Sequence, residues 1–191
     1  SSNAEAEQQM RDLEFIKPVE KYALEKSYDS YAQAGIYAME LTEKRHLEKP
    51  LMVTMENIFP EQYGSHPEEL KSLINKSREA MADRLIGQWG YSQSEAEAKA
   101  KTHIRATLDT GHINTWRKYF QGSDQEFKNW LLEQTEDLAK ADIVGNVHLS
   151  DNFGYQDDHL APGQGTTPVK DMMRILKKHG YSGPMTVEPG A

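Results

Sequence analysis

Strand-like and helix-like segments alternate along residues 51–190, and this alternation limits the fold more than any other feature of the sequence. Helical patterns at residues 66–86, 123–141 and 167–180 separate four largely apolar runs, at residues 51–58, 103–111, 142–152 and 184–190. Strands that alternate with helices of 14–21 residues predict parallel βαβ units. Strands that are apolar on both faces are typical of a parallel sheet covered on both sides. The sequence therefore predicts an α/β fold.

Two capping-box patterns mark helix starts. Ser123 and Glu126 stand in the positions of a capping box ahead of the 123–141 helix. Ser92 and Glu95 repeat the pattern ahead of a further short helical segment at residues 91–102. We expect this additional helix to be a peripheral insertion.

The N-terminal part of the chain has a different organisation. Residues 1–4 are typical of an expression-tag remnant, so they are excluded from the fold prediction. Residues 5–49 are helical in pattern, with a break expected at Pro18 and no strand. We therefore expect a helical segment at residues 5–49, followed by an α/β unit at residues 50–191.

Composition excludes several classes of protein. A formal net charge of −8 disfavours a surface built to neutralise nucleic-acid phosphates. With no cysteine, the chain has neither disulfides nor thiolate metal ligands, so any metal must be bound by His, Asp and Glu. No apolar run is long enough to cross a bilayer. We expect a soluble, cytoplasmic protein without a membrane partner.

The choice between two parallel architectures depends on an absent motif. A doubly wound sheet usually has a glycine-rich phosphate turn after an early strand, but the sequence contains no G-x-G-x-x-G. An arc of a (β/α)8 barrel is therefore the favoured architecture, and four βα units are about half of such a barrel. Because a half barrel leaves two sheet edges unpaired, we expect the chain to associate with another copy or with a missing N-terminal half.

Each of the four predicted strands ends in an acidic residue or a histidine. These residues are Glu56, Asp109, His148 and Glu188, separated by 53, 39 and 40 residues. In a parallel barrel the carboxyl ends of the strands converge on one face, where active sites are built. Three carboxylates and an imidazole suit a divalent ion such as Mn, Mg, Co or Zn. Without a cation, three converging carboxylates would repel one another. The pattern therefore predicts a metal site.

Five short motifs appear in a fixed order: ENIFP, LDTGHINTW, HLSDN, DDHLAPGQG and TVEPG. Together they resemble the xylose isomerase-like TIM barrels, a superfamily of sugar isomerases and epimerases, inosose dehydratases and apurinic endonucleases. The resemblance covers residues 50–190 and implies strands five to eight of the barrel. It also implies that Glu56, Asp109, His148 and Glu188 are the four ligands of a single metal.

The resemblance further implies a reaction. In the ketose epimerases of this superfamily, the two residues corresponding to Glu56 and Glu188 also serve as an acid/base pair that moves a proton next to a carbonyl. The metal polarises the substrate oxygens and stabilises an enediolate. The function implied is therefore a metal-dependent sugar or polyol isomerase or epimerase, acting on a sugar or sugar phosphate.

Four more residues have roles that the resemblance leaves open. His112 is similar to a residue that binds substrate in the epimerases and a second metal in the endonucleases. Asp157 and His159 match a D-x-H that ligates a further zinc in multi-metal members; with one metal, they would orient substrate or water. Asp151 lies near the site and would bind metal, hold His148 or contact substrate. The alternatives to an isomerase are a zinc-dependent apurinic endonuclease-type phosphodiesterase, a sugar or inosose dehydratase, and a non-catalytic scaffold.

Overall fold

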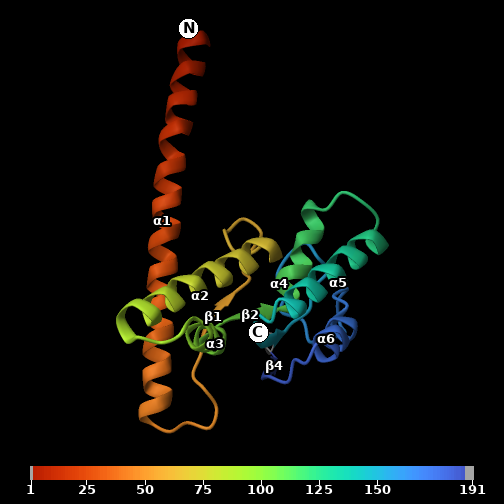
Figure 1. Ribbon diagram of the computed structural model, residues 1–191. Helices are drawn as coiled ribbons and strands as arrows, with labels where there is room; N and C mark the ends of the chain where they lie inside the picture. The colour runs from red at the N-terminus through yellow and green to blue at the C-terminus, as the bar shows by residue number, and fades with distance from the viewer. Residues whose placement is uncertain (1, 188–191) are drawn as a thin grey trace.

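A computed structural model describes the backbone of residues 2–187 and the side chains of residues 23–187. Its strands are separated along the chain by one or more helices (Figure 1). The strands are β1 (Val53–Glu56), β2 (Ile104–Asp109), β3 (Val144–Leu149) and β4 (Met185–Val187). The helices are α1 (Ser2–Lys44), α2 (Pro67–Trp89), α3 (Gln93–His103), α4 (Thr110–Asn114), the 3-10 helix η1 (Thr115–Tyr119), α5 (Asp124–Lys140) and α6 (Val169–Lys178).

The four strands form one parallel sheet in the order β1-β2-β3-β4. Consecutive strands are thus neighbours, as in successive units of a (β/α)8 barrel, whereas a doubly wound sheet reverses its order at a switch point. The prediction of a barrel arc is confirmed. Because all strands run the same way, their carboxyl ends lie along one edge, which is where the predicted site residues stand.

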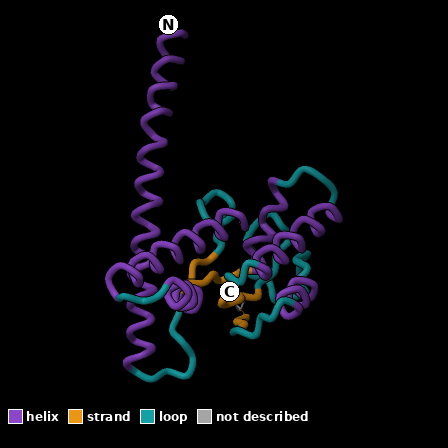
Figure 2. Tube along the Cα trace, viewed as in Figure 1, coloured by secondary structure: helices purple, strands orange, loops and turns teal. Residues whose placement is uncertain are grey.

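The core lies between the sheet and its helices, which surround the short strands in Figure 2. Along β2, Ile104, Ala106 and Leu108 are completely buried and face the helices. The residues between them in the sequence point to the opposite face of the sheet, because side chains alternate along a strand. This second series ends in Asp109.

The first helix differs from its prediction. Its backbone is helical from Ser2 to Lys44 without the break expected at Pro18. A proline inside a helix removes one hydrogen bond and clashes with the preceding turn, but the helix can continue as regular turns on either side. Figure 1 shows the N-terminal half of α1 extending beyond the rest of the molecule, while its C-terminal half packs against α2 and α3.

The helix α3 also differs from its prediction. Its capping box between Ser92 and Glu95 is confirmed. However, α3 is not peripheral, because Ala96 and Ala100 are completely buried against α2. Two alanines four residues apart give a helix a small apolar face that allows close packing.

Among the described elements, no helix combines the length and apolar character that a membrane span requires.

Candidate metal centre

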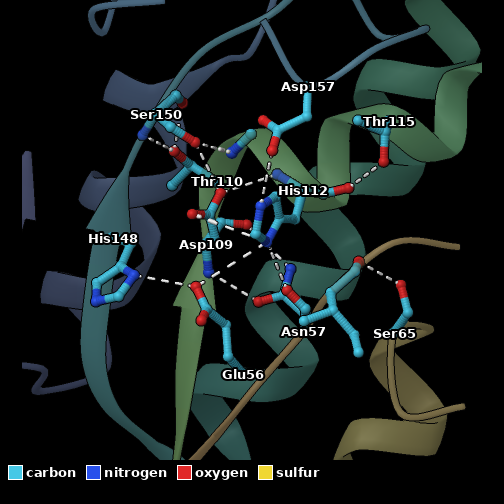
Figure 3. A network of polar contacts seen from close by, with 12 residues as sticks. Glu56, Asn57, Ser65, Asp109, Thr110, His112, Thr115, His148, Ser150 and Asp157 are labelled. Atoms are coloured by element: carbon cyan, nitrogen blue, oxygen red, sulfur yellow. Dashed lines mark hydrogen bonds and ion pairs between the residues drawn. The ribbon is translucent and has the colours of Figure 1, made fainter. Parts of the chain in front are cut away.

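Three of the four predicted ligands meet at the carboxyl edge of the sheet (Figure 3). Glu56 is the last residue of β1, Asp109 the last of β2, and His148 the penultimate residue of β3. One ligand atom from each lies within 4.8 Å of the other two. The strand register brings this about, since Asp109 and His148 are direct partners across β2 and β3. The fourth predicted ligand, Glu188, lies outside the described residues.

Glu56 and His148 contact each other directly. The Nδ1 atom of His148 lies 3.0 Å from Oε1 of Glu56, and Nε2 of His148 lies 3.3 Å from the side-chain amide of Asn146. Burial raises the pKa of the Glu56 carboxyl; His148 opposes this shift and Asp109 adds to it. A carboxyl with a raised pKa is better suited to exchange protons near neutral pH than an ordinary glutamate.

Asp109 presents a single unpaired oxygen to the site. Its side chain is completely buried, and Oδ1 accepts hydrogen bonds from the backbone N–H of His112 at 2.9 Å and the hydroxyl of Ser150 at 2.7 Å. Oδ2 is buried with no hydrogen-bond partner. A buried carboxylate oxygen without a partner is costly unless a cation or proton satisfies it. This unpaired atom and the O/O/N donor set fit a divalent metal bound by Glu56, Asp109 and His148.

Asn57 fixes the backbone of Asp109. Its side-chain oxygen accepts the Asp109 N–H at 2.7 Å, and its amide donates to the Asp109 carbonyl at 3.0 Å. The Asp109 side chain also caps α4, so the strand ends and the helix begins at the same residue. The sequence prediction extended this strand to residue 111 and missed α4 and η1. The only available signal was the N-cap preference of aspartate.

His112 stands beside the three residues, within α4. Its Nδ1 lies 2.9 Å from the Asn57 carbonyl, and its Nε2 lies 3.2 Å from Oδ2 of Asp157. Burial disfavours the imidazolium, but Asp109, the Asn57 carbonyl, Asp157 and Glu56 outweigh this effect, so the pKa of His112 is raised. His112 is therefore held in an anionic setting beside the ligand cluster.

Asp157 links two histidines in the loop that follows β3. Its Oδ2 lies 3.0 Å from Nε2 of His159 as well as 3.2 Å from Nε2 of His112. Its Oδ1 is buried without a hydrogen-bond partner. His112 and His159, two of the four residues whose roles were left open, are thus brought together around the carboxylate of a third, Asp157, whereas the neighbouring Asp158 is exposed.

Asp151 has a position that the sequence did not suggest. Its carboxylate is completely buried and accepts four backbone N–H groups at 2.8–2.9 Å, from residues 152, 163, 165 and 167. Burial opposes ionisation of Asp151, but the hydrogen bonds from Thr167, Gly165 and Gly163 outweigh it and lower the pKa. With both oxygens occupied, Asp151 holds the loop that closes behind Asp157 and His159.

An exposed aromatic residue adjoins the cluster. The Phe59 ring lies 5.4 Å from the His112 ring and is 43% exposed. It belongs to the ENIFP motif, but its place beside His112 could not be predicted from the sequence. An exposed aromatic side chain beside a polar cluster is a common feature of ligand sites.

The chain is similar over part of its length to several known proteins. The chain is 34% identical over 86 residues to an uncharacterized protein of Methanocaldococcus jannaschii, covering 45% of this chain and 26% of that protein. It is 38% identical over 47 residues to fructoselysine 3-epimerase of Escherichia coli O157:H7, covering 25% and 17%. It is 29% identical over 111 residues to inosose isomerase of Halalkalibacterium halodurans, covering 54% and 34%. The matches thus span 17–34% of the length of these relatives.

One protein family matches most of the chain. The family described as xylose isomerase-like TIM barrel matches residues 48–191, which include all four strands and every predicted site residue. The strand order agrees with this assignment. The chain therefore belongs to the xylose isomerase-like TIM barrel family, and its described part forms four strands of such a barrel.

Proposed function

We propose that this chain carries the metal site of a sugar or polyol isomerase or epimerase that depends on a divalent ion. The observation that supports this most is the Glu56–Asp109–His148 cluster, with three ligand atoms within 4.8 Å and one buried carboxylate oxygen unpaired. The names of two relatives, a fructoselysine epimerase and an inosose isomerase, support the reaction class. Glu188 is proposed as the fourth ligand.

The residues of the cluster have separate tasks in this proposal. A bound Mn, Mg, Co or Zn ion would supply a Lewis acid that stabilises negative charge on the oxygens of an enediolate. Glu56 moves the proton at the carbon next to the carbonyl, and Glu188 is the second member of the acid/base pair. His112 keeps its Nδ1 contact with the Asn57 carbonyl and would turn its Nε2–H from Asp157 to a substrate oxygen. Phe59 offers an apolar ring to the C–H face of the sugar.

A second candidate function is supported by the contacts of Asp157. Its carboxylate joins His112 and His159, and its Oδ1 is buried and unpaired, so further zinc ions could bind there. A multi-zinc cluster would suit a phosphodiesterase that acts at abasic sites. The net charge of −8 argues against binding DNA.

The sheet suggests a further partner. In the described sheet, β1 and β4 each pair with one strand only, so each has one edge without a strand neighbour. We propose that strands from further βα units or from a second copy of the chain cover these edges. Analytical ultracentrifugation of the chain would detect a dimer; a monomer at all concentrations would contradict pairing between copies.

A metal-binding and exchange experiment tests the proposed function. We expect the purified chain to bind one Mn²⁺ and, with D-fructose, D-tagatose or an inosose in D₂O, to introduce deuterium next to the carbonyl, detected by NMR. Glu56→Gln should abolish exchange and weaken metal binding, whereas Asp158→Asn, an exposed carboxylate of a nearby loop, should change neither. Two or three zinc ions per chain with cleavage of an abasic duplex would instead favour the phosphodiesterase. No metal binding would refute both.

A further inference from the structure

Ser150 is a completely buried residue that follows β3, and its hydroxyl contacts the carboxylate of Asp109. The hydroxyl donates to Oδ1 of Asp109 at 2.7 Å and accepts the backbone N–H of Gly111 at 3.2 Å. Figure 3 shows Ser150 on the side of Asp109 away from Glu56. The hydroxyl is therefore bound to Oδ1, the oxygen of Asp109 that also accepts the backbone N–H of His112.

The two oxygens of Asp109 are thereby made unequal. Oδ1 accepts two hydrogen bonds, from Ser150 and from the His112 backbone, while Oδ2 accepts none and lies 3.9 Å from Nδ1 of His112. A carboxylate whose one oxygen is engaged in this way offers the other to a cation and resists rotation about its terminal bond. Hydrogen bonds of this kind, one step removed from the metal, typically change metal affinity by 10–100-fold.

Gly111 supports the same interpretation. Its backbone does not adopt the left-handed conformation that favours glycine. A Cβ atom at this position would instead overlap the Ser150 hydroxyl. The absence of a side chain at residue 111 therefore leaves the space that this hydroxyl occupies.

We propose that Ser150 is a positioning residue that orients Asp109 so that it presents Oδ2 alone to the metal. This inference rests on the proposed metal site. Replacing the hydroxyl leaves Oδ1 with one donor and allows the carboxylate to rotate, so the cation loses a fixed single-oxygen ligand.

The test compares matched variants by their binding of Co²⁺, measured by calorimetry and by visible absorption. Ser150→Ala should bind Co²⁺ about 10–100-fold more weakly and with an altered spectrum. Ser150→Cys, whose thiol is a weaker donor, should bind with intermediate affinity. Ser77→Ala is the control, because Ser77 is also completely buried and its hydroxyl donates to the Leu73 carbonyl within α2, outside the ligand cluster.

The outcomes separate this inference from the proposed function. If the parent chain binds Co²⁺ and Ser150→Ala binds it equally well with an unchanged spectrum, the positioning role is wrong while the metal site stands. If Ser150→Ala and Ser77→Ala lose affinity equally, the effect is one of general stability and the inference is again refuted. If the parent chain binds no Co²⁺, the metal site itself is wrong. Should Ser150→Ala fail to fold, Ser150→Cys decides, and parent-like binding by it refutes the role.

Discussion

Replacing Asp151 by asparagine should destabilise the chain, because the Asp151 carboxylate accepts hydrogen bonds from the backbone of the loop at residues 163–167. One oxygen of Asp151 accepts the N–H groups of Asn152 and Thr167, and the other accepts those of Gly163 and Gly165. The asparagine amide can accept on one side only, so two N–H groups would face an NH₂ group. A buried donor without an acceptor costs about 1–3 kcal/mol.

The expected decrease in the free energy of unfolding lies near the lower end of the range for two buried N–H groups that lose their acceptor. Gly163 and Gly165 are the more exposed pair, and water will partly replace their acceptor. We therefore expect asparagine to keep its oxygen toward Asn152 and Thr167 and to lower the free energy of unfolding by about 2–3 kcal/mol. With a urea m-value of about 2 kcal/mol/M, the midpoint should fall by about 1–1.5 M.

Urea unfolding followed by circular dichroism measures this shift, with Asp158→Asn as the control for a change of charge at an exposed position in the nearby loop. The pH dependence adds a second check. Because folding lowers the pKa of Asp151 below its unfolded value of about 3.9, its contribution is complete above that value and is lost as the pH falls through the folded pKa. The gap between parent and variant should thus be constant from pH 5 to 8 and narrow below pH 4. A midpoint shift no larger than that of Asp158→Asn would refute the reasoning.

Three further changes have defined outcomes. Gly35→Ala should cost about 1–3 kcal/mol, because its Cβ would lie 2.7 Å from Sδ of Met81 in the core; an unchanged melting temperature would contradict this packing. Gly87→Ala should instead stabilise the chain by about 0.5–1 kcal/mol, since nothing lies within 4 Å of a Cβ on that helical position, and a lower melting temperature would count against it. Arg78→Met should lower the free energy of unfolding, measured in urea, by about 2–4 kcal/mol, because the buried guanidinium donates to the carbonyls of residues 104 and 142. A loss below about 1 kcal/mol would show that water replaces the guanidinium as the donor to these carbonyls.

The pattern of apolar runs was sufficient to predict the order and type of the main elements. It worked because the strand residues that face the helices have to be apolar, as Ile104, Ala106 and Leu108 are, and because a helix start needs an acceptor for its first N–H groups. Both capping boxes are present in the structure. The ends of the strands were predicted less accurately: β1, β2 and β3 are each shorter than the corresponding apolar run, and the outer residues of 51–58 and 142–152 lie in connections.

The polar contacts of the site could not be predicted in the same way. Residues that end parallel strands can be expected to converge, which placed Glu56, Asp109 and His148 near one another; their role as ligands remains a prediction. The hydrogen bonds of Asn57 and Ser150 to Asp109 join residues 41–52 positions apart. They depend on side-chain rotamers and on the strand register, and neither is encoded in local spacing. For the same reason the sequence could not show that Asp151 faces backbone amides.

Asp109 divides its carboxylate between two tasks, because one oxygen caps α4 while the other is left for the proposed ion. This division restricts any redesign of the site toward a different ion. Replacing Asp109 by histidine or cysteine would remove the helix cap together with the ligand, so a softer donor set at this position would be obtained only with a weakened fold. Neither Glu56 nor His148 is the N-cap of a described helix, and they are the positions at which a designer could change ion preference and still keep the scaffold.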